Sequence, residues 1–387
     1  MNNGTLSIAG PGASSLTIHG SFNIDAATVS ISGLTLRNGQ GPVGGAIRAN
    51  NGSLTINGVY FFENFGAEGG AIFLMGGTHS IVNSTFESNL ATGSCGAIAN
   101  EVATLYIANS TFFFNAPGDN GVGSGGALCS TGAGSSTVLR NVTIWQNGPI
   151  NAGTGGGIYV EDSSVNIGNS IIAGNAAPGG KPDIHLVSGS VTSAGNNLIG
   201  DNSGDSADTE GAIAYQLSDK LDIDPKLMLP ATNGGQTRTV ALMAGSPAID
   251  AGNNSLAVNP ADGNPLVTDQ RGVDRILDGN GDSTATVDIG AYETLVPTAA
   301  PVSLSGRVAA ATGEPIRGAS VTIAGGGLAE PRTVLTGTFG NYSFGDLQTG
   351  TTYVVTVSAR RYYFSVPSRV VTLTDNVAGV DFVAGQQ

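Results

Sequence analysis

A short sequence pattern that recurs five times between Gly44 and Asn175 constrains the fold more than any other feature. Each copy opens on a glycine-rich motif, continues as a run rich in Ile, Val, Thr and Phe, and closes on Phe-x-x-Asn or a related motif. Successive copies are 25, 26, 32 and 28 residues apart, measured between the closing residues Asn64, Asn89, Asn115, Asn147 and Asn175. Because a period in this range is typical of stacked repeats, the chain is expected to form a solenoid.

The residue types within the repeat select a β-solenoid over a helical one. Long stretches of Ala, Leu, Glu and Lys at helical spacing are absent, whereas short runs with period-two alternation recur between Gly and Asn residues. Three such strands separated by turns, in about 25 residues, describe one coil of a parallel β-helix. The repeat therefore predicts an all-β fold.

Aligning the five copies predicts three interior columns and one polar ladder. Like residues should stack on like, because neighbouring coils lie about 4.8 Å apart. The closing asparagines are expected to pair through their amides along the stack, at a turn that tolerates left-handed backbone. The columns are Ile56, Ile81, Ile107, Leu139 and Ile167; Phe61, Phe86, Phe112, Ile144 and Ile172; and Ile47, Ile72, Ile98, Leu128 and Ile158.

Composition agrees with a solenoid and limits the class of partner. The chain has 387 residues, including 60 glycines at repeated positions, and only 11% of residues are charged. The formal net charge of −14 argues against nucleic acid and anionic membranes as partners. No apolar run is as long as a membrane-spanning helix, which needs about 20 residues.

Changes in pattern along the chain predict four regions. We expect a β-helix over residues 1–215, a closing segment over 216–293, a linker over 294–302 and a compact β domain over 303–387. No signal peptide precedes the first strand-like residues, so we expect a truncated chain whose first coils are missing, with a native start at Met1 as the alternative. An uncapped first coil would leave an open edge that could self-associate.

Several motifs resemble known families. The Gly-Gly-Ala-Ile and Phe-x-x-Asn pairing resembles the repeats of polymorphic outer-membrane proteins and of bacterial right-handed β-helix surface proteins. The segment from Asp224 to Glu293 resembles the choice-of-anchor Q domain through Asn233-Gly234-Gly235, Asp269-Gln270-Arg271-Gly272 and Asp288-Ile289-Gly290, although Val240 stands where that family has His. The resemblance implies a pectate-lyase-like right-handed β-helix on a secreted bacterial protein.

The C-terminal region has its own signature. Ser305-Gly306-Arg307-Val308, Gly340-Asn341-Tyr342 and Tyr353-Val354-Val355 belong to short strands with turn signals about every ten residues, which is typical of a β-sandwich. This region resembles the carboxypeptidase regulatory-like domain, a prealbumin-like sandwich that shares its general fold with starch-binding modules. Such domains are non-catalytic accessories, so the resemblance does not imply a peptidase.

Candidate catalytic residues are few within the coils. Inverting glycoside hydrolysis needs two carboxylates about 6.5–9.5 Å apart. The only adjacent acids there are Glu161 and Asp162, whose side chains should point to opposite faces of a strand. Cys95 and Cys129 stand four positions out of register, which predicts free thiols instead of a disulfide.

Asp278, Asn280 and Asp282, followed by Asp288, form a candidate calcium site. Alternating side-chain oxygens in one turn suit Ca²⁺, which takes six to eight oxygen ligands. The match to an EF-hand loop fails where Ser283 and Ile289 replace Gly and Glu. The same residues are also ordinary turn formers, and both readings stay open.

The sequence therefore predicts a secreted or cell-surface structural or adhesive module, without catalytic activity and without a cofactor other than this calcium. Its partners would be an extracellular glycan or a neighbouring surface. The alternative is a carbohydrate-binding or polysaccharide-degrading β-helix whose coils or sandwich hold the glycan.

Overall fold

The computed structural model describes residues 4–118, 123–149, 153–180, 182–203, 213–295, 302–326, 328, 330–373 and 375–385. The chain divides into two compact units, Met1–Thr294 and Leu295–Gln387. The first unit is a parallel β-solenoid and the second is a β-sandwich, which confirms the predicted fold class. Most of the predicted linker, residues 296–301, lies outside the described residues.

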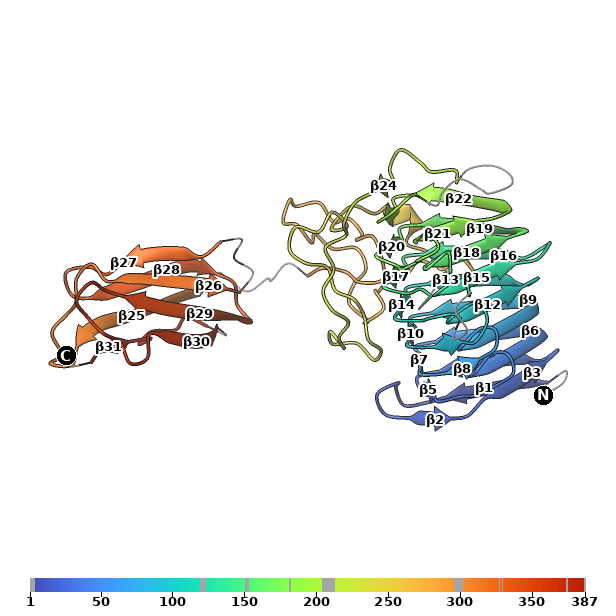
Figure 1. The fold of residues 1–387 in the computed structure, drawn as a ribbon, viewed down its shortest axis with the longest axis horizontal. Coiled ribbons are helices and arrows are strands. Elements are labelled where there is room, and N and C mark those ends of the chain that lie inside the picture. Colours follow the sequence, from blue (N-terminus) through green and yellow to red (C-terminus); the bar gives the residue numbers. More distant parts are fainter. Residues whose placement is uncertain are drawn as a thin grey trace. The chain divides into compact units, whose positions relative to one another are not determined.

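The solenoid has three strand-bearing faces, and its coils stack from β1 to β24 (Figure 1). Faces 1 and 2 form one sheet, because β6 (Ile47–Asn57) and β9 (Ile72–Val82) bend from one face to the other. Besides these, face 1 contains β3 (Phe22–Asp25), β12 (Ile98–Glu101), β15 (Leu128–Thr131), β18 (Ile158–Glu161) and β21 (Ile184–Leu186). Face 2 contains β1 (Thr5–Ala9), β4 (Thr28–Ser32), β13 (Thr104–Ala108), β16 (Ser136–Arg140), β19 (Ser163–Gly168) and β22 (Gly189–Gly195).

Face 3 is the surface on which the closing segment packs. It contains β2 (Thr17–His19), β5 (Thr35–Arg37), β7 (Tyr60–Phe62), β10 (Thr85–Glu87), β14 (Thr111–Phe113), β17 (Thr143–Trp145), β20 (Ile171–Ala173), β23 (Leu198–Ile199) and β24 (Lys220–Leu221). A two-stranded pair of β8 (Phe65–Gly66) and β11 (Leu90–Ala91) lies at a turn between faces.

The three predicted interior columns are confirmed. Ile107 pairs in register with Ile81 on one side and Leu139 on the other, and all three are fully buried. In the aromatic column, the rings of Phe61, Phe86 and Phe112 stack in parallel with 4.5 Å between successive centroids. Short β-branched runs thus form strands because each buries one face against identical positions of the next coil.

Glycine recurs in each repeat because neighbouring turns approach closely. A Cβ added to Gly70 would lie 2.2 Å from the carbonyl oxygen of Gly96, and one added to Gly96 would lie 2.3 Å from that of Gly126. The preceding position has left-handed backbone, with φ of 62° at Gly69 and 73° at Gly125. Both requirements favour glycine, which explains the repeated pair.

The predicted asparagine ladder is confirmed. The Asn64 side chain donates to Oδ1 of Asn89 at 2.9 Å, and Asn89, Asn115 and Asn147 continue the same bond to the next coil. The last amide, that of Asn175, donates to Oδ1 of Asp183 at 2.8 Å. A carboxylate suits this end position because it accepts hydrogen bonds only and leaves no amide without a partner.

The second unit contains two packed sheets around its own apolar core. One sheet holds β28 (Asn341–Leu347), β25 (Val302–Ala310) and β31 (Phe382–Ala384). The other holds β27 (Arg332–Leu335), β26 (Ser320–Gly325), β29 (Thr351–Ser358) and β30 (Ser368–Leu373). Buried residues from both sheets, including Val321, Ile323, Phe344 and Val355, form one cluster.

Candidate functional site

Residues 222–294 form a mostly irregular closing segment, with one short 3₁₀ helix, η1 (Asn254–Leu256), that covers part of face 3 (Figure 1). Its apolar side chains, including Leu227, Val240 and Ile289, pack with Phe113 and Ile171 of the β-helix. Outward positions of face 3 are apolar here because they are covered. Polar and charged side chains make the other contacts between face 3 and the closing segment.

A column of threonines on face 3 provides the first polar attachment. The Oγ1 atom of Thr85 donates to the carbonyl oxygen of Arg238 at 2.6 Å, and that of Thr111 donates to Oε1 of Gln270 at 2.5 Å. In the next coil, Thr143 Oγ1 accepts a bond from the Ala291 N–H at 3.0 Å. Three successive coils are therefore held by three separate parts of the closing segment.

An ion pair forms the second attachment. The Arg238 guanidinium lies 2.5 Å from Oε1 of Glu87, and the Tyr60 hydroxyl donates to the other Glu87 oxygen. Burial, reinforced by the adjacent Glu87 carboxylate, raises the pKa of Tyr60 well above its ordinary value. Glu87 is thus shared between a cation of the closing segment and a phenol of the preceding coil.

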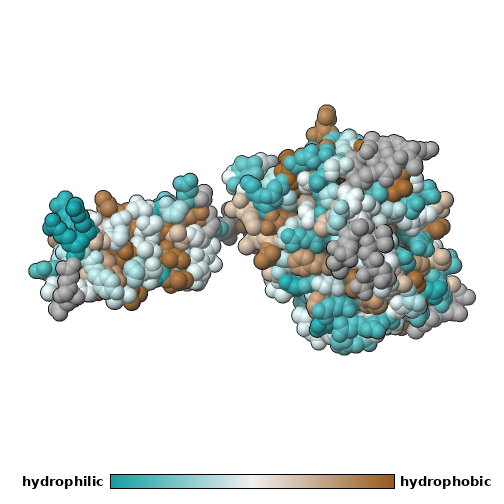
Figure 2. Space-filling model, in the orientation of Figure 1, coloured by the Kyte–Doolittle hydropathy of each residue, from teal (hydrophilic) through white to brown (hydrophobic). Residues whose placement is uncertain are grey.

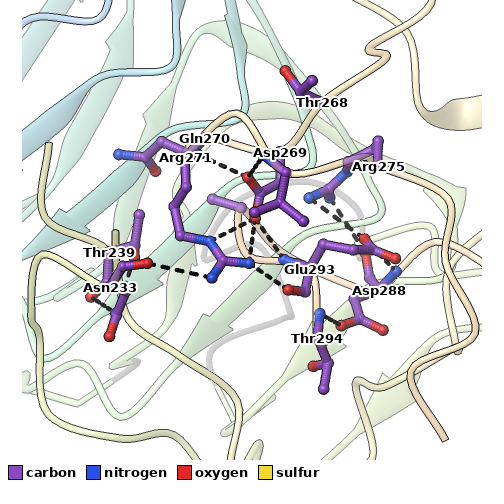
Figure 3. Close-up of polar contacts among 12 residues, drawn as sticks. Asn233, Thr239, Thr268, Asp269, Gln270, Arg271, Arg275, Asp288, Glu293 and Thr294 are labelled. Carbon is purple, nitrogen blue, oxygen red and sulfur yellow. Dashed lines mark hydrogen bonds and ion pairs between the residues drawn. The ribbon is translucent and has the colours of Figure 1, made fainter. Parts of the chain in front are cut away.

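The centre of the closing segment is a buried cluster of charged groups (Figure 3). Nε of Arg271 donates to Oδ2 of Asp269 at 2.8 Å, and the Arg271 guanidinium stacks 3.6 Å above the Tyr292 ring. Arg275 Nη1 lies 3.8 Å from Glu293 Oε2, and neither side chain is exposed. Asp288 joins the cluster by accepting bonds from the backbone N–H groups of Asp250 and Thr294.

Burial perturbs the acids of this cluster. Loss of solvation raises the pKa of Glu293 to about 9, although the Arg275 guanidinium acts in the opposite direction. Desolvation also raises the pKa of Asp288. The Asp288 carboxylate adds to this rise in the pKa of Glu293, whereas hydrogen bonds from the backbone N–H groups of Asp288 and Leu277 oppose it. Because these groups are almost fully shielded, the cluster holds the segment together and does not face a ligand.

The residues of the candidate calcium site are divided between two environments. Asp278 accepts bonds from the N–H groups of Gly281, Asp282 and Ser283, so it closes its own turn. Asn280 and Asp282 also accept local N–H bonds, whereas Asp288 lies in the buried cluster. In the described ranges no group of three or more His, Cys, Asp or Glu residues could hold a metal ion. The side-chain oxygens that would bind calcium thus already accept hydrogen bonds within the chain. Calcium binding stays a prediction.

The adjacent acids of the coils lie apart from the closing segment. Glu161 ends β18 and accepts a bond from the Tyr159 hydroxyl at 3.0 Å. Asp162 has left-handed backbone and accepts a bond from the Ser188 hydroxyl in the next coil. His79 is buried, and its Nε2 lies 2.9 Å from the Gly76 carbonyl oxygen.

The prediction of free thiols is wrong, because Cys95 and Cys129 form a disulfide with 5.3 Å between their Cα atoms. Cys129 lies on β15, directly beside Ala99 of β12. Cys95 precedes that strand and occupies the left-handed position that glycine fills in the other repeats, with φ of 68°. The turn places Cys95 beside the small Ala99 side chain. A count of positions along a straight strand therefore overestimates the distance between Cys95 and Cys129.

Sequence reasoning gave no role to Arg238, Gln270, Arg271, Arg275 or Glu293. A signal was nonetheless present, because this chain is poor in charge and the four charged residues of this set stand close to Gly-containing motifs. The partner of Arg238 could not be identified from the sequence, because Glu87 lies 151 residues earlier. The repeat of the coils does not extend into the closing segment, so no periodicity relates Glu87 to Arg238.

The sandwich carries an open groove of about 630 Å³. It is lined by Arg307, Asn341, Ser343 and Asp381 and, on an apolar side, by Leu335. Figure 2 shows apolar patches among hydrophilic ones on the drawn face of this unit. Phe339 and Tyr363 are among its exposed aromatic residues.

Comparisons with known proteins agree with the architecture. Residues 303–384 match the family model of the carboxypeptidase regulatory-like domain, which confirms the predicted resemblance of this part of the chain. No curated protein and no solved structure matches the chain. Among the described residues, none of the helical structure is long and apolar enough to cross a membrane. The chain is therefore a β-solenoid protein with a C-terminal carboxypeptidase regulatory-like domain.

Proposed function

We propose that this chain is an extracellular or cell-surface structural and adhesive module, without catalytic activity of its own. The observation that carries the proposal is the use of charged side chains for architecture. The Glu87–Arg238 pair fastens the closing segment to the coils. The buried pairs Arg271–Asp269 and Arg275–Glu293 hold that segment together instead of lining an open cleft. A solenoid of stacked coils followed by a separate sandwich suits the presentation of binding surfaces.

The disulfide supports the proposed location. Bonds such as Cys95–Cys129 persist in oxidising compartments and are rare in the cytosol of mesophiles. The resemblance of the coils to bacterial surface repeats and of residues 224–293 to the choice-of-anchor Q domain agrees with an extracellular place.

Adhesion without turnover is testable on the full chain. We expect binding to immobilised extracellular glycans or to intact bacterial cells, and no release of shorter oligosaccharides from the bound glycans with or without Ca²⁺. Release of products that disappears in Glu161→Gln would overturn the non-catalytic part. A chain that adheres to neither glycans nor cells would overturn the adhesive part.

Carbohydrate is the partner class that a specific observation favours. The sandwich groove combines the Arg307 and Asp381 side chains with an exposed Leu335, which is 69% accessible. Sugars present both hydroxyl groups and apolar C–H faces, and sites for them combine polar and apolar surfaces accordingly. Substituting Leu335 with Asp should then weaken glycan binding if this groove is the contact.

A further inference from the structure

A second hollow lies between the β-helix and the start of the closing segment. The outward column of face 3 passes from Phe113 to Trp145 and Ala173, which pair in register. The next coil carries Gly200 there, and a Cβ on it would lie 2.8 Å from the Ala173 Cβ. The residues of this column are therefore small after Trp145. A hollow of about 430 Å³ lies beside the indole.

Small residues keep this hollow open and the indole in place. Gly174 has φ of 64°, and a Cβ added there would lie 3.3 Å from Nε1 of Trp145. Pro182 and Pro225 line other parts of the hollow and have restricted backbones. The volume is within the range of small-molecule sites, about 300–1,000 Å³. The wall therefore combines a large flat apolar ring with rigid surroundings.

Three carboxyl groups line the same hollow: Asp183, Asp201 and Asp224. Asp183 is buried, and its Oδ2 accepts a bond from the Asp201 N–H at 2.7 Å, which positions the backbone of Asp201. The exposed Asp201 and Asp224 each use Oδ1 to accept a backbone N–H two residues further on, at 2.8 and 2.9 Å. These bonds hold both carboxylates in defined positions at the rim.

We propose that this hollow binds one uncharged or amino-bearing pyranose unit of an extracellular glycan. The apolar C–H face of the sugar would lie against Trp145, and its hydroxyl groups would donate to Asp201 and Asp224. Carboxylates accept up to two hydrogen bonds per oxygen, which suits a ring of hydroxyl donors. The same charges disfavour uronic acids by like-charge repulsion. This inference rests on the proposed adhesive function and gives it a second contact site besides the sandwich groove.

Trp145 is the only tryptophan in the chain, so its fluorescence reports on this hollow directly. The full chain would be titrated with cellotetraose, maltotetraose and chitotetraose, and with tetragalacturonate as the anionic probe. We expect a saturable change in emission with at least one neutral probe and at least tenfold weaker binding of tetragalacturonate. Asp224→Asn should weaken the neutral interaction at least tenfold.

The matched control is Asp274→Asn, which removes the same charge from an exposed position of the closing segment that does not line the hollow. It should bind as the wild type does, and both variants should unfold at the wild-type midpoint. Calorimetry on Trp145→Ala should show loss of the interaction. Equal affinity in Asp224→Asn and wild type, or glycan binding by the full chain without a change in emission, would overturn the site but leave the adhesive function. Failure to adhere to any glycan or cell would overturn both.

Discussion

Ile107 occupies the middle of an interior column and has no exposed surface. In Ile107→Asp, the new carboxylate would be buried among apolar neighbours without a partner. We expect the free energy of unfolding to fall by about 4 kcal/mol or more. Urea denaturation followed by circular dichroism would measure the loss.

Thr104→Asp provides the matched control, because Thr104 is only half-buried on the same strand, β13. It should change the free energy of unfolding by less than about 1 kcal/mol. Similar losses in both variants would contradict the assignment of inward and outward positions.

Glu293 makes stability depend on pH. Its pKa is raised from 4.5 to about 9 in the folded chain, so the folded state binds more protons than the unfolded state between these values. Its contribution is fully present below about pH 4.5 and is lost as the pH rises through about 9, by at most about 1.4 kcal/mol per pH unit. Urea unfolding at pH 5, 7 and 8.5 would show the decline.

Glu293→Gln retains the shape of the protonated side chain and removes its titration. The stability of this variant relative to the wild type should therefore increase from pH 5 to pH 8.5. Curves that stay parallel over this interval would show that Glu293 titrates alike in the folded and unfolded states.

At the scale of elements, the asparagine ladder joins successive coils. Asn115 accepts from the backbone and side-chain amides of Asn89 and donates to Asn147 and the Phe86 carbonyl oxygen. Asn115→Ala leaves several buried polar groups without partners, so a loss of about 3 kcal/mol or more is expected. Thermal unfolding would measure it. Asn166→Ala, which removes a half-exposed amide on face 2, should cost less than about 1 kcal/mol, and equal costs would contradict a structural role for the ladder.

The disulfide is the second connection between coils. Replacing both Cys95 and Cys129 with Ser should reduce the free energy of unfolding by about 2–4 kcal/mol, because the link closes a loop across 34 residues of sequence. Denaturation of the wild type with and without a reductant should reproduce the difference. A wild-type chain that reacts with a thiol reagent under non-reducing, denaturing conditions would contradict the bond.

At the scale of the whole molecule, the sandwich has a complete core of its own. It forms a separate compact unit, and its buried cluster contains residues from both of its sheets. A fragment of residues 302–387 should therefore fold alone with one cooperative thermal transition. Broad, non-cooperative melting followed by circular dichroism would contradict this independence.

The complementary fragment, residues 1–296, is expected to self-associate through its first coil. In the described chain β1 pairs with β4 alone, so its other edge presents backbone groups that can pair with a second copy. Sedimentation velocity should show concentration-dependent association of this fragment. A monodisperse monomer at all concentrations would contradict the open edge.

The sequence alone determined the coils, because a solenoid repeats one local environment. Each residue contacts the same position of the next coil, so a period and an alternation are enough to place Ile107, Phe86 and Asn115. The sandwich was equally accessible through its own regular strands and turns. No long-range information is needed for either region.

Only the tertiary structure decided how the non-repeating parts meet the coils. Arg238 and Gln270 contact residues more than 150 positions earlier, and no local pattern encodes such pairings. The hollow beside Trp145 likewise forms where the closing segment lies beside Ala173 and Gly200, the small residues of the face 3 column. Cys95 reached Cys129 through a left-handed turn that straight-strand geometry does not describe. Periodicity specifies which residues of successive coils are neighbours. The contacts between the coils and the closing segment depend instead on the path of an irregular backbone, which no repeat describes.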